Sequence, residues 1–298
     1  MVDPVKSVVL TGASRGIGHA TVKRFSEAGW RIITCSRESI PNECRRDANW
    51  AHHISTDLAD VQSLNAFIEK ANTILGEGGL DALVNNAAQS PKTPYKERLG
   101  SLNGSLEDWR EVYDLNLFAP LTLARGFAAA LHRAEGSIVN ITSIAGHAAH
   151  PFAGSAYSTS KSALSALTRE MAVEFAELGV RVNAVAPGEI ATEMIGAEYE
   201  SLIPRIPLNR MGTADEVASV IFQLCGEDFG YVTGTEIFVT GGTDVVTVYI
   251  FLIFHFWREF SDQLIQCYYF VLFHFRWFCR HFTLQHYDVF NVVRMCFF

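Results

Sequence analysis

The stretch Thr11-Gly-Ala-Ser-Arg-Gly-Ile-Gly18 is the part of the sequence that decides the fold. It follows an apolar run, Ser7–Thr11, that is typical of a buried strand, and it opens an amphipathic helical pattern that continues to about Ala28. A strand, a glycine-rich turn and a helix in this order can cradle a pair of phosphates, because the helix start offers free N–H groups and the positive end of its dipole. The stretch therefore predicts a dinucleotide-binding domain.

The remainder of residues 1–244 alternates short apolar runs with helical patterns. Strands are expected at Ser7–Thr11, Trp30–Cys35, Leu80–Val84, Ser137–Thr142, Arg181–Ala186 and Glu236–Thr240. Helices are expected up to Ala28, at Leu58–Leu75, near 105–134 and 156–178, and at Ala214–Leu224. This alternation predicts an α/β fold, a single Rossmann-type doubly wound parallel sheet flanked by helices, with an atypical C-terminal tail.

A second informative stretch is Ser155-Ala-Tyr-Ser-Thr-Ser-Lys161, which places Tyr157 and Lys161 on one face of a predicted helix. A phenol normally ionises near pH ~10, and a nearby ammonium group favours the phenolate and lowers that pKa. We expect Lys161 to act on Tyr157 in this way, so that Tyr157 can exchange a proton with a substrate near neutral pH.

These two stretches, together with Asn85-Asn-Ala-Ala88 and Pro187-Gly188, resemble the classical short-chain dehydrogenase/reductase family over residues 5–244. The likeness includes that family's 3-oxoacyl-carrier-protein reductases, in a general way. One departure is Ala88, which stands where the family usually has glycine. The resemblance implies transfer of a hydride between a nicotinamide cofactor and a ketone or secondary alcohol.

The resemblance also implies roles for individual residues. The implied catalytic residues are Asn116, Ser143, Tyr157 and Lys161. Ser143 would polarise the substrate oxygen, Lys161 would also hold the nicotinamide ribose, and Asn116 would link to Lys161 in a proton relay. The implied cofactor-binding residues are Gly12, Ser14, Arg15, Gly16, Ile17, Gly18, Ser36, Arg37, Asp57, Leu58, Asn85, Ala87, Tyr157, Lys161, Pro187, Gly188, Ile190 and Thr192.

Charge near the end of the second strand indicates which nicotinamide cofactor is used. That strand ends in Cys35-Ser36-Arg37 with no carboxylate at its tip, and Arg15 lies inside the glycine-rich turn. A ribose 2′-phosphate needs cations, whereas a free ribose diol prefers a carboxylate acceptor. We therefore expect NADP(H) in preference to NAD(H), although Glu38 follows immediately and opposes this choice.

The substrate side of the site is less defined by the sequence. Candidate wall residues are Gln89, Ser90, His147, His150, Phe152, Glu189 and the segment Met194–Leu208. His147 and His150 have a metal-like spacing but no carboxylate or cysteine close by in the sequence, so no metal site is expected. A non-catalytic NADP(H)-binding regulator or scaffold is the alternative function, and it predicts a damaged catalytic set.

The composition of the chain limits which partners and which cellular compartment are expected. A formal net charge of −8 without a Lys/Arg block gives no basic surface for nucleic acid. Six cysteines lack paired spacing, which is typical of free thiols in a reducing compartment. Asp3 and Lys6 interrupt the N-terminal apolar stretch, so no secretory signal is expected. We expect a cytoplasmic homodimer or homotetramer, in which the family's two long helices meet across subunits.

Residues 245–298 differ sharply from the domain before them. They contain no Gly, Ala, Pro or Lys but hold 12 of the chain's 21 Phe residues. The apolar runs Val245–Trp257 and Gln263–Phe275 are shorter than the ~20 residues that a helix needs to cross a bilayer. A membrane anchor, as in a tail-anchored reductase, and a helical oligomerisation arm are two interpretations. The composition favours a third, a segment without evolved structure such as readthrough or a shifted frame.

Overall fold

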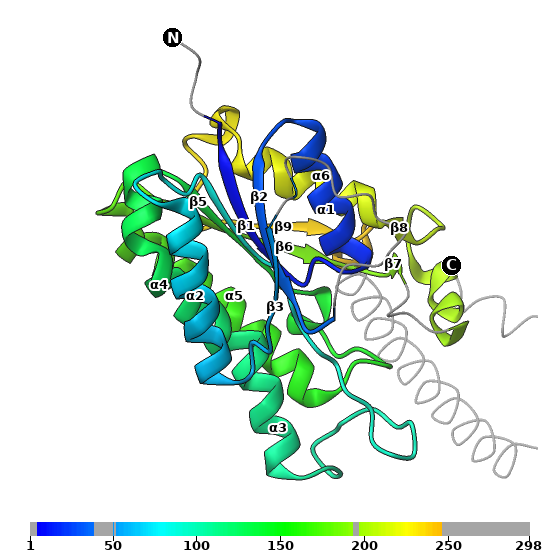
Figure 1. Ribbon diagram of the computed structural model, residues 1–298. Coiled ribbons are helices and arrows are strands. Elements are labelled where there is room, and N and C mark those ends of the chain that lie inside the picture. Colours follow the sequence, from blue (N-terminus) through cyan, green and yellow to red (C-terminus); the bar gives the residue numbers. More distant parts are fainter. Residues whose placement is uncertain (1–4, 39–49, 51, 193–196, 246–298) are drawn as a thin grey trace, which may run out of the picture. The chain divides into compact units, whose positions relative to one another are not determined.

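The computed structural model describes residues 5–38, 50, 52–192 and 197–245, and the chain divides into two units at Asp244 and Val245. The first unit is built on a seven-stranded sheet in the order β3-β2-β1-β4-β5-β6-β9, with every neighbouring pair parallel (Figure 1). The strands are β1 (Ser7–Thr11), β2 (Arg31–Ser36), β3 (His52–Ser55), β4 (Ala82–Asn85), β5 (Ser137–Ile141), β6 (Arg181–Pro187) and β9 (Glu236–Val239). The order reverses between β1 and β4, as in a doubly wound fold.

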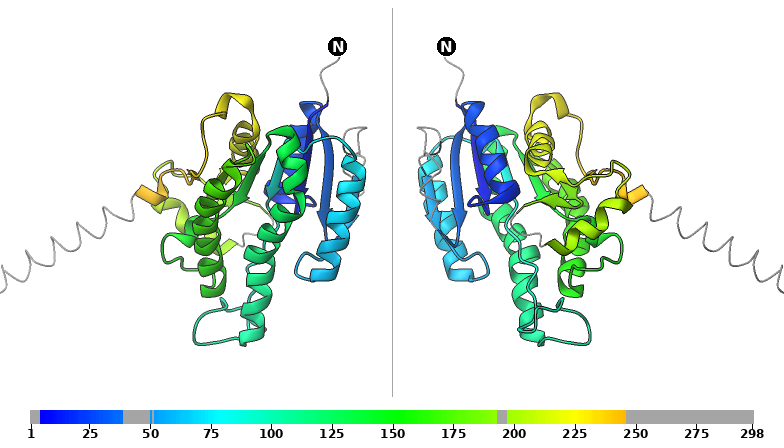
Figure 2. Two further views of the ribbon diagram at one scale, coloured as in Figure 1. Left: turned by 90° about the vertical axis from the view of Figure 1, so that its left-hand side faces the viewer. Right: turned by 90° about the vertical axis from the view of Figure 1, so that its right-hand side faces the viewer.

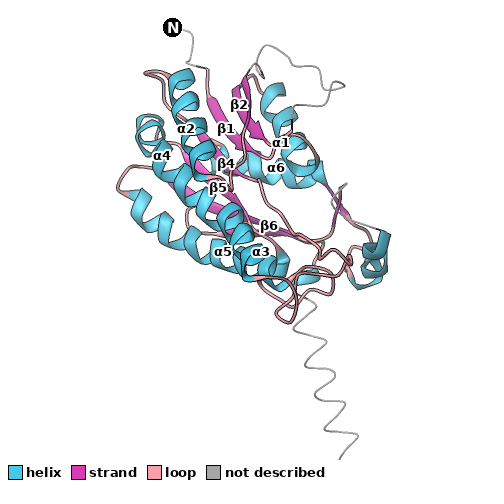
Figure 3. Ribbon diagram, turned by 60° about the horizontal axis from the view of Figure 1, so that its bottom comes forward, coloured by secondary structure: helices cyan, strands magenta, loops and turns pink. Residues whose placement is uncertain are grey.

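Helices cover both faces of this sheet, and each face has its own apolar core (Figures 2 and 3). Helices α1 (Gly16–Glu27) and α6 (Ala214–Cys225) pack over one face through residues such as Phe25 and Ile221. Helices α2 (Val61–Leu75), α4 (Ala119–Ala134) and α5 (Ser155–Ala176) cover the other, where Phe67 and Phe127 are buried. Because both faces are covered, the central strands β1, β4 and β5 are buried along their whole length, and the predicted Rossmann-type fold is confirmed.

Several boundaries differ from those expected. Strand β3 lies before Asp57, where a third strand was expected but without bounds, because its sequence, His-His-Ile-Ser, lacks an apolar run. Helix α2 begins at Val61 instead of Leu58, because the Asp60 side chain caps it by accepting a hydrogen bond from the Ser63 N–H. Two short strands, β7 (Ile190–Ala191) and β8 (Gly212–Thr213), form a separate pair beyond the main sheet.

The long helix expected near 105–134 has a break in its middle. It consists of α3 (Leu106–Tyr113), a π-helical turn η1 (Asp114–Phe118) and α4, with Pro120 in the first turn of α4. Asn116 lies inside the π-helical turn, where the widened helix frees backbone and side-chain groups for other partners. The break therefore sets the position of one residue of the implied catalytic set.

Within the part of the chain that is described, no helix combines the length and the hydropathy that crossing a bilayer requires. The expectations for the tail, including a membrane anchor, concern residues 246–298, which lie outside that part.

Candidate active site

A cavity of about 290 Å³ lies where the strands of the first unit end. The glycine turn after β1, the ends of β2, β4, β5 and β6 and the start of α5 all contribute to its wall. Of the predicted site residues, Gly12, Ser14, Arg15, Gly16, Ile17, Gly18, Ser36, Arg37, Asp57, Leu58, Ala87, Ser143, Tyr157, Lys161, Pro187, Gly188, Ile190 and Thr192 line it. Parallel strands end at one edge of a sheet, so residues far apart in the sequence meet here.

The glycine turn requires its small residues. Gly12 has a φ of 70°, and a Cβ atom at this position would stand 2.8 Å from the Asn86 amide nitrogen. A Cβ at Gly18 would collide with the backbone oxygen of Gly12. The Asn86 amide group holds the turn by donating to the carbonyl oxygens of Thr11 and Gly12, both at 3.0 Å. The backbone can therefore approach a diphosphate closely at this turn.

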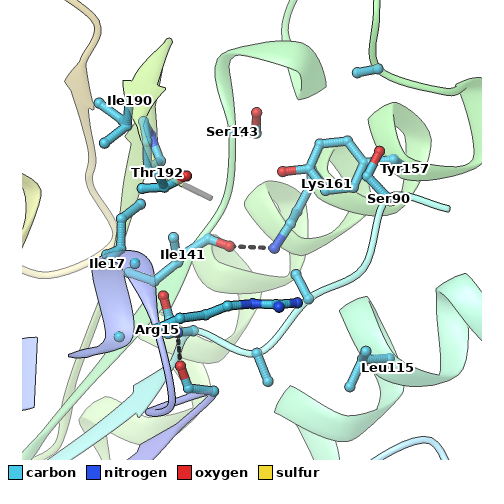
Figure 4. Close-up of a pocket in the computed structure, with 18 of the residues that line it drawn as sticks. Arg15, Ile17, Ser90, Leu115, Ile141, Ser143, Tyr157, Lys161, Ile190 and Thr192 are labelled. Atoms are coloured by element: carbon cyan, nitrogen blue, oxygen red, sulfur yellow. Dashed lines mark hydrogen bonds between the residues drawn. The ribbon is translucent and has the colours of Figure 1, made fainter. Parts of the chain in front are cut away.

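Helix α1 begins directly after this turn without a side-chain cap and without an acidic residue in its first turn. Its first N–H groups and its positive dipole end are left for an anion. Arg15 precedes the helix and lines the cavity (Figure 4). Arg37 and Glu38 line the cavity beyond the end of β2, and neither arginine is in an ion pair within the described residues.

The catalytic end of the cavity brings Ser143, Tyr157 and Lys161 together (Figure 4). Lys161 is 2% exposed, and its Nζ atom lies 5.8 Å from the centroid of the Tyr157 ring. The same atom donates a 2.6 Å hydrogen bond to the Ile141 carbonyl oxygen at the end of β5. Ser143 caps the short helix that follows β5, and its side chain is hydrogen-bonded to that of Tyr157.

Burial changes the pKa values of this pair in opposite directions. It lowers the pKa of Lys161 from 10.5 to about 7, because the charged ammonium is desolvated. It raises the pKa of Tyr157 above 10.0, and the hydrogen bond from Ser143 only partly opposes this change. The pKa of Tyr157 is therefore raised and not lowered as expected from Lys161, because desolvation is the largest influence on it. Tyr157 is a neutral phenol here and is ready to donate a proton.

Two predicted site residues lie behind the cavity wall. Asn85 is buried, and its amide nitrogen donates a 2.8 Å hydrogen bond to Asn140 on the neighbouring strand. Asn116 exchanges two hydrogen bonds with the backbone of Gln89, and its amide also donates to the Ser160 hydroxyl at 3.0 Å. These contacts fix the Gln89 backbone beside the start of α5, and the relay from Asn116 to Lys161 stays a prediction.

Some wall residues were not predicted. Asn86 lines the cavity where Asn85 was expected to do so, and the Asn-Asn doublet could have indicated either residue. Thr142 also lines the cavity, and its hydroxyl donates a 2.5 Å hydrogen bond to Glu236 on β9. Nothing in the local sequence indicates this pair, because its members lie 94 residues apart. The remaining unpredicted lining residues are Thr56, Ala88, Lys92, Leu115, Ile141, Ile144, Ala145 and Ala153.

The expected substrate walls are present in part. Ser90, His150, Glu189 and Tyr199 line the cavity, whereas Gln89, His147, Phe152, Leu202 and Ile203 do not. His150 faces Glu189, with 3.2 Å between Nε2 and a carboxylate oxygen, and both side chains are nearly buried. His147 instead reaches Glu236 at 3.0 Å, outside the cavity wall. Met194 and Ile195, part of the expected lid, lie outside the described residues.

A doubly wound sheet, a glycine turn at its switch point and a Tyr–Lys pair in one cavity define a dinucleotide-binding oxidoreductase of the Rossmann type. Comparison with known proteins narrows this class. The sequence model of the family described as enoyl-(acyl carrier protein) reductase matches residues 12–244. Protein FixR of Bradyrhizobium diazoefficiens is 53% identical over 239 residues, which are 80% of this chain and 86% of that protein.

Further relatives agree with this placement. The 3-oxoacyl-(acyl-carrier-protein) reductase FabG of Aquifex aeolicus is 35% identical over 252 residues, 80% of this chain and 96% of that protein. A crystal structure of a short chain dehydrogenase/reductase family oxidoreductase from Brucella ovis, with a partially ordered NAD, is 47% identical with a TM-score of 0.69. It covers 80% of this chain and 100% of that one. The chain belongs to the classical short-chain dehydrogenase/reductase family.

Proposed function

We propose that the protein transfers a hydride between NADP(H) and a ketone or secondary alcohol. The observation that carries this proposal is the cavity that Ser143, Tyr157 and Lys161 share with the glycine turn. A bound nicotinamide supplies or takes up the hydride. The residues of the chain bind the substrate oxygen and move its proton.

Each residue of the catalytic set has a role in this proposal. Tyr157 is a neutral phenol, so it can donate its proton to the substrate oxygen during reduction and recover it during alcohol oxidation. Ser143 donates a hydrogen bond to the same oxygen and stabilises the charge that develops there. Lys161 holds the nicotinamide ribose, and Asn116 supports the start of α5 through Ser160.

The wall of the cavity fits a dinucleotide. A Cβ atom at Gly12 or Gly18 would collide with Asn86, so only glycine allows the turn to pack this tightly beside the start of α1, where the diphosphate would bind. Asp57 and Leu58 follow β3 at the adenosine end, and Ile190 and Thr192 follow Pro187 and Gly188 at the nicotinamide end. Asn85 would act through the strands it joins, since it does not line the cavity.

The proposed preference for NADP(H) rests on charge. Arg15 and Arg37 line the adenosine end together with the carboxylates of Glu38 and Asp57. Two guanidinium groups without described carboxylate partners favour a 2′-phosphate through charge-assisted hydrogen bonds. Structures of two relatives contain NAD or NADH, so the preference separates this chain from them and needs a direct test.

We also propose a cytoplasmic homodimer or homotetramer that uses α4 and α5 between subunits. Phe118 beside the start of α4 is 50% exposed, and Val173 on α5 is 75% exposed. Large apolar side chains in water are stabilised by burial against a second copy. Light scattering coupled to gel filtration tests this assembly, and a monomer at micromolar concentration would contradict it.

A screen of carbonyl compounds and alcohols, followed by NADPH and NADH absorbance, tests the reaction. The Tyr157→Phe variant serves as the control, because it removes the proton donor and keeps the ring. We expect turnover by the unaltered protein and a loss of at least about 100-fold in the variant. Equal turnover by both proteins would exclude Tyr157 as the proton donor. No turnover by either protein with any compound would instead support a nucleotide-binding protein without catalysis.

A further inference from the structure

Glu189 is a buried carboxylate in the wall of the cavity. It follows Pro187 and Gly188 at the end of β6, and its side chain is only 4% exposed. Its Oε1 atom lies 3.2 Å from His150 Nε2. Its Oε2 atom is fully buried and has no hydrogen-bond partner among the described residues. One oxygen of this carboxylate is therefore satisfied, and the other is an unused acceptor.

The hydrogen bonds of His150 fix which ring nitrogen carries the proton. Nδ1 accepts from two backbone N–H groups, those of Phe152 at 3.2 Å and Ala153 at 3.0 Å. An atom that accepts from two N–H groups carries no proton, so the ring proton is on Nε2 and is donated to Glu189. The His150 ring also packs against Tyr199, with 5.7 Å between centroids, which holds its orientation. His150 therefore occupies Oε1 and leaves Oε2 free.

Other cations do not supply the missing partner. Lys92 lines the same cavity, but its Nζ atom lies 4.0 Å from Glu198 and 3.5 Å from the Phe152 carbonyl oxygen. A buried carboxylate oxygen without a donor costs free energy, and a ligand that donates to it recovers that cost. The cavity that Glu189 lines is the one that holds Tyr157.

We propose that Glu189 selects substrates that carry a second polar group, a hydroxyl or an ammonium, which donates a hydrogen bond to its Oε2 atom. This inference rests on the proposed function. Hydroxylated or aminated ketones and their alcohols satisfy the acceptor. A simple ketone or a plain acyl chain leaves it buried without a partner, so such compounds are poor substrates.

Matched substrate pairs and one isosteric variant test the selection. The full-length protein is assayed with hydroxyketones, ketoses, polyols and amino alcohols, each beside its deoxy or O-methyl analogue. We expect kcat/KM to fall about tenfold or more when the donor is removed. The size of the fall in the hydroxyl pairs and in the ammonium pairs shows which donor the site prefers.

Glu189→Gln replaces the unpartnered acceptor Oε2 with a hydrogen-bond donor. The His150 proton would hold the amide oxygen, so the amide NH₂ group would take the place of Oε2 and offer a donor there. We expect the ratio of kcat/KM for a donor-bearing substrate to kcat/KM for its donor-free analogue to fall at least tenfold in this variant. The O-methyl analogues should become better substrates relative to their parent compounds. Glu107→Gln, the same change on the exposed face of α3, is the matched control and should leave the preference unchanged.

Three results would overturn the inference. They are equal use of donor-bearing and donor-free substrates, equal effects of Glu189→Gln on both members of a pair, and weaker NADPH binding by the variant in a fluorescence titration. The last result would make the cofactor the partner of Oε2. A different result would refute the proposed function, namely full activity of the Tyr157→Phe variant. A protein that neither turns over nor binds any panel member, judged by thermal shift with NADPH, would refute both.

Discussion

The Nζ atom of Lys161 lies 5.8 Å from the centroid of the Tyr157 ring, and the two side chains share one turn of α5. Burial acts on both, because it favours the uncharged amine and the uncharged phenol. Tyr157 therefore keeps its proton near neutral pH, whereas a pKa of about 7 leaves Lys161 charged in a part of the molecules at that pH. Binding of an oxidised nicotinamide adds a positive charge at this place, which favours the phenolate.

Lys161→Met should change how stability depends on pH. The folded-state pKa of Lys161 is about 7 and the ordinary value is 10.5, so the unfolded chain binds more protons between these values. Stability from this group therefore rises with pH across that window, and the cost of burying the charge is fully present below pH 7. We subtract the unfolding free energy of the unaltered protein from that of Lys161→Met. We expect this difference to be a few kcal/mol larger at pH 6 than at pH 10, because each unit of pKa shift corresponds to about 1.4 kcal/mol.

Denaturant titrations of both proteins measure this difference without NADP(H). Lys70→Met on the exposed side of α2 is the matched control, and it should show the same pH dependence as the unaltered protein. A constant difference between Lys161→Met and the unaltered protein at all pH values would show that Lys161 is not desolvated.

Reduction and oxidation should respond to pH with opposite signs. Reduction needs the neutral phenol of Tyr157, so its rate should fall only at high pH, since burial raises the pKa above 10.0. Oxidation needs the phenolate, so its rate should rise with pH. Because oxidised nicotinamide is positively charged, the apparent pKa should be lower for oxidation than for reduction. Rate profiles in both directions measure the two values, and identical profiles would assign the titration to another group.

Arg37→Ala should weaken the preference for NADP(H). A charge-assisted hydrogen bond to a phosphate contributes about 1.5–3 kcal/mol, so we expect KM for NADPH to rise about tenfold or more. KM for NADH should stay nearly unchanged, because NADH lacks the 2′-phosphate. Arg110→Ala, which removes an exposed arginine of α3, is the control. Equal effects on both cofactors would show that Arg37 does not contact the phosphate.

Glu236→Ala should destabilise the first unit and disturb the catalytic end. The Glu236 carboxylate accepts 2.5 Å hydrogen bonds from Thr142 and Ser165, and it lies 3.0 Å from His147. Its removal leaves two hydroxyl donors without their acceptor, which costs about 1–3 kcal/mol each when they are buried. Because Thr142 precedes Ser143, we also expect a lower kcat.

The matched control for this change is Glu227→Ala. Glu227 forms a 2.6 Å pair with Lys6 but is 87% exposed, and solvent screening leaves exposed pairs with little effect on stability. Thermal unfolding should therefore separate the two variants by several degrees. If Glu236→Ala unfolds at the same temperature as the control, Glu236 is not a structural link between β5 and β9.

Deletion of residues 246–298 should preserve or improve soluble activity. The sequence of this segment is rich in Phe and lacks Gly, Ala, Pro and Lys, which favours aggregation. Specific activity and light scattering of the shortened and full-length proteins measure the effect. Loss of activity on truncation would give the tail a role in assembly or in membrane attachment.

Much of the fold followed from local patterns. The glycine stretch 11–18, the apolar strands and the Tyr157–Lys161 spacing each depend on residues within one or two helical turns of each other, so they could be predicted. Strand β3 could not, because its polar residues are held by pairing with β2 and not by their own hydropathy. The π-helical turn at Asn116 could not be predicted either, because the 3.6-residue periodicity of the sequence indicates one continuous helix there.

Neighbouring residues are enough to define the family, the glycine turn and the catalytic spacing. The partners of the buried polar groups, in contrast, depend on how distant segments fold together. Glu189 follows the end of β6 and meets His150 across 39 positions. Glu236 meets Thr142 across 94 positions, because β9 begins beside the part of β6 that pairs with the end of β5. The protonation of Tyr157 was decided in the same way, since desolvation depends on everything packed around a side chain and not on the spacing to one lysine.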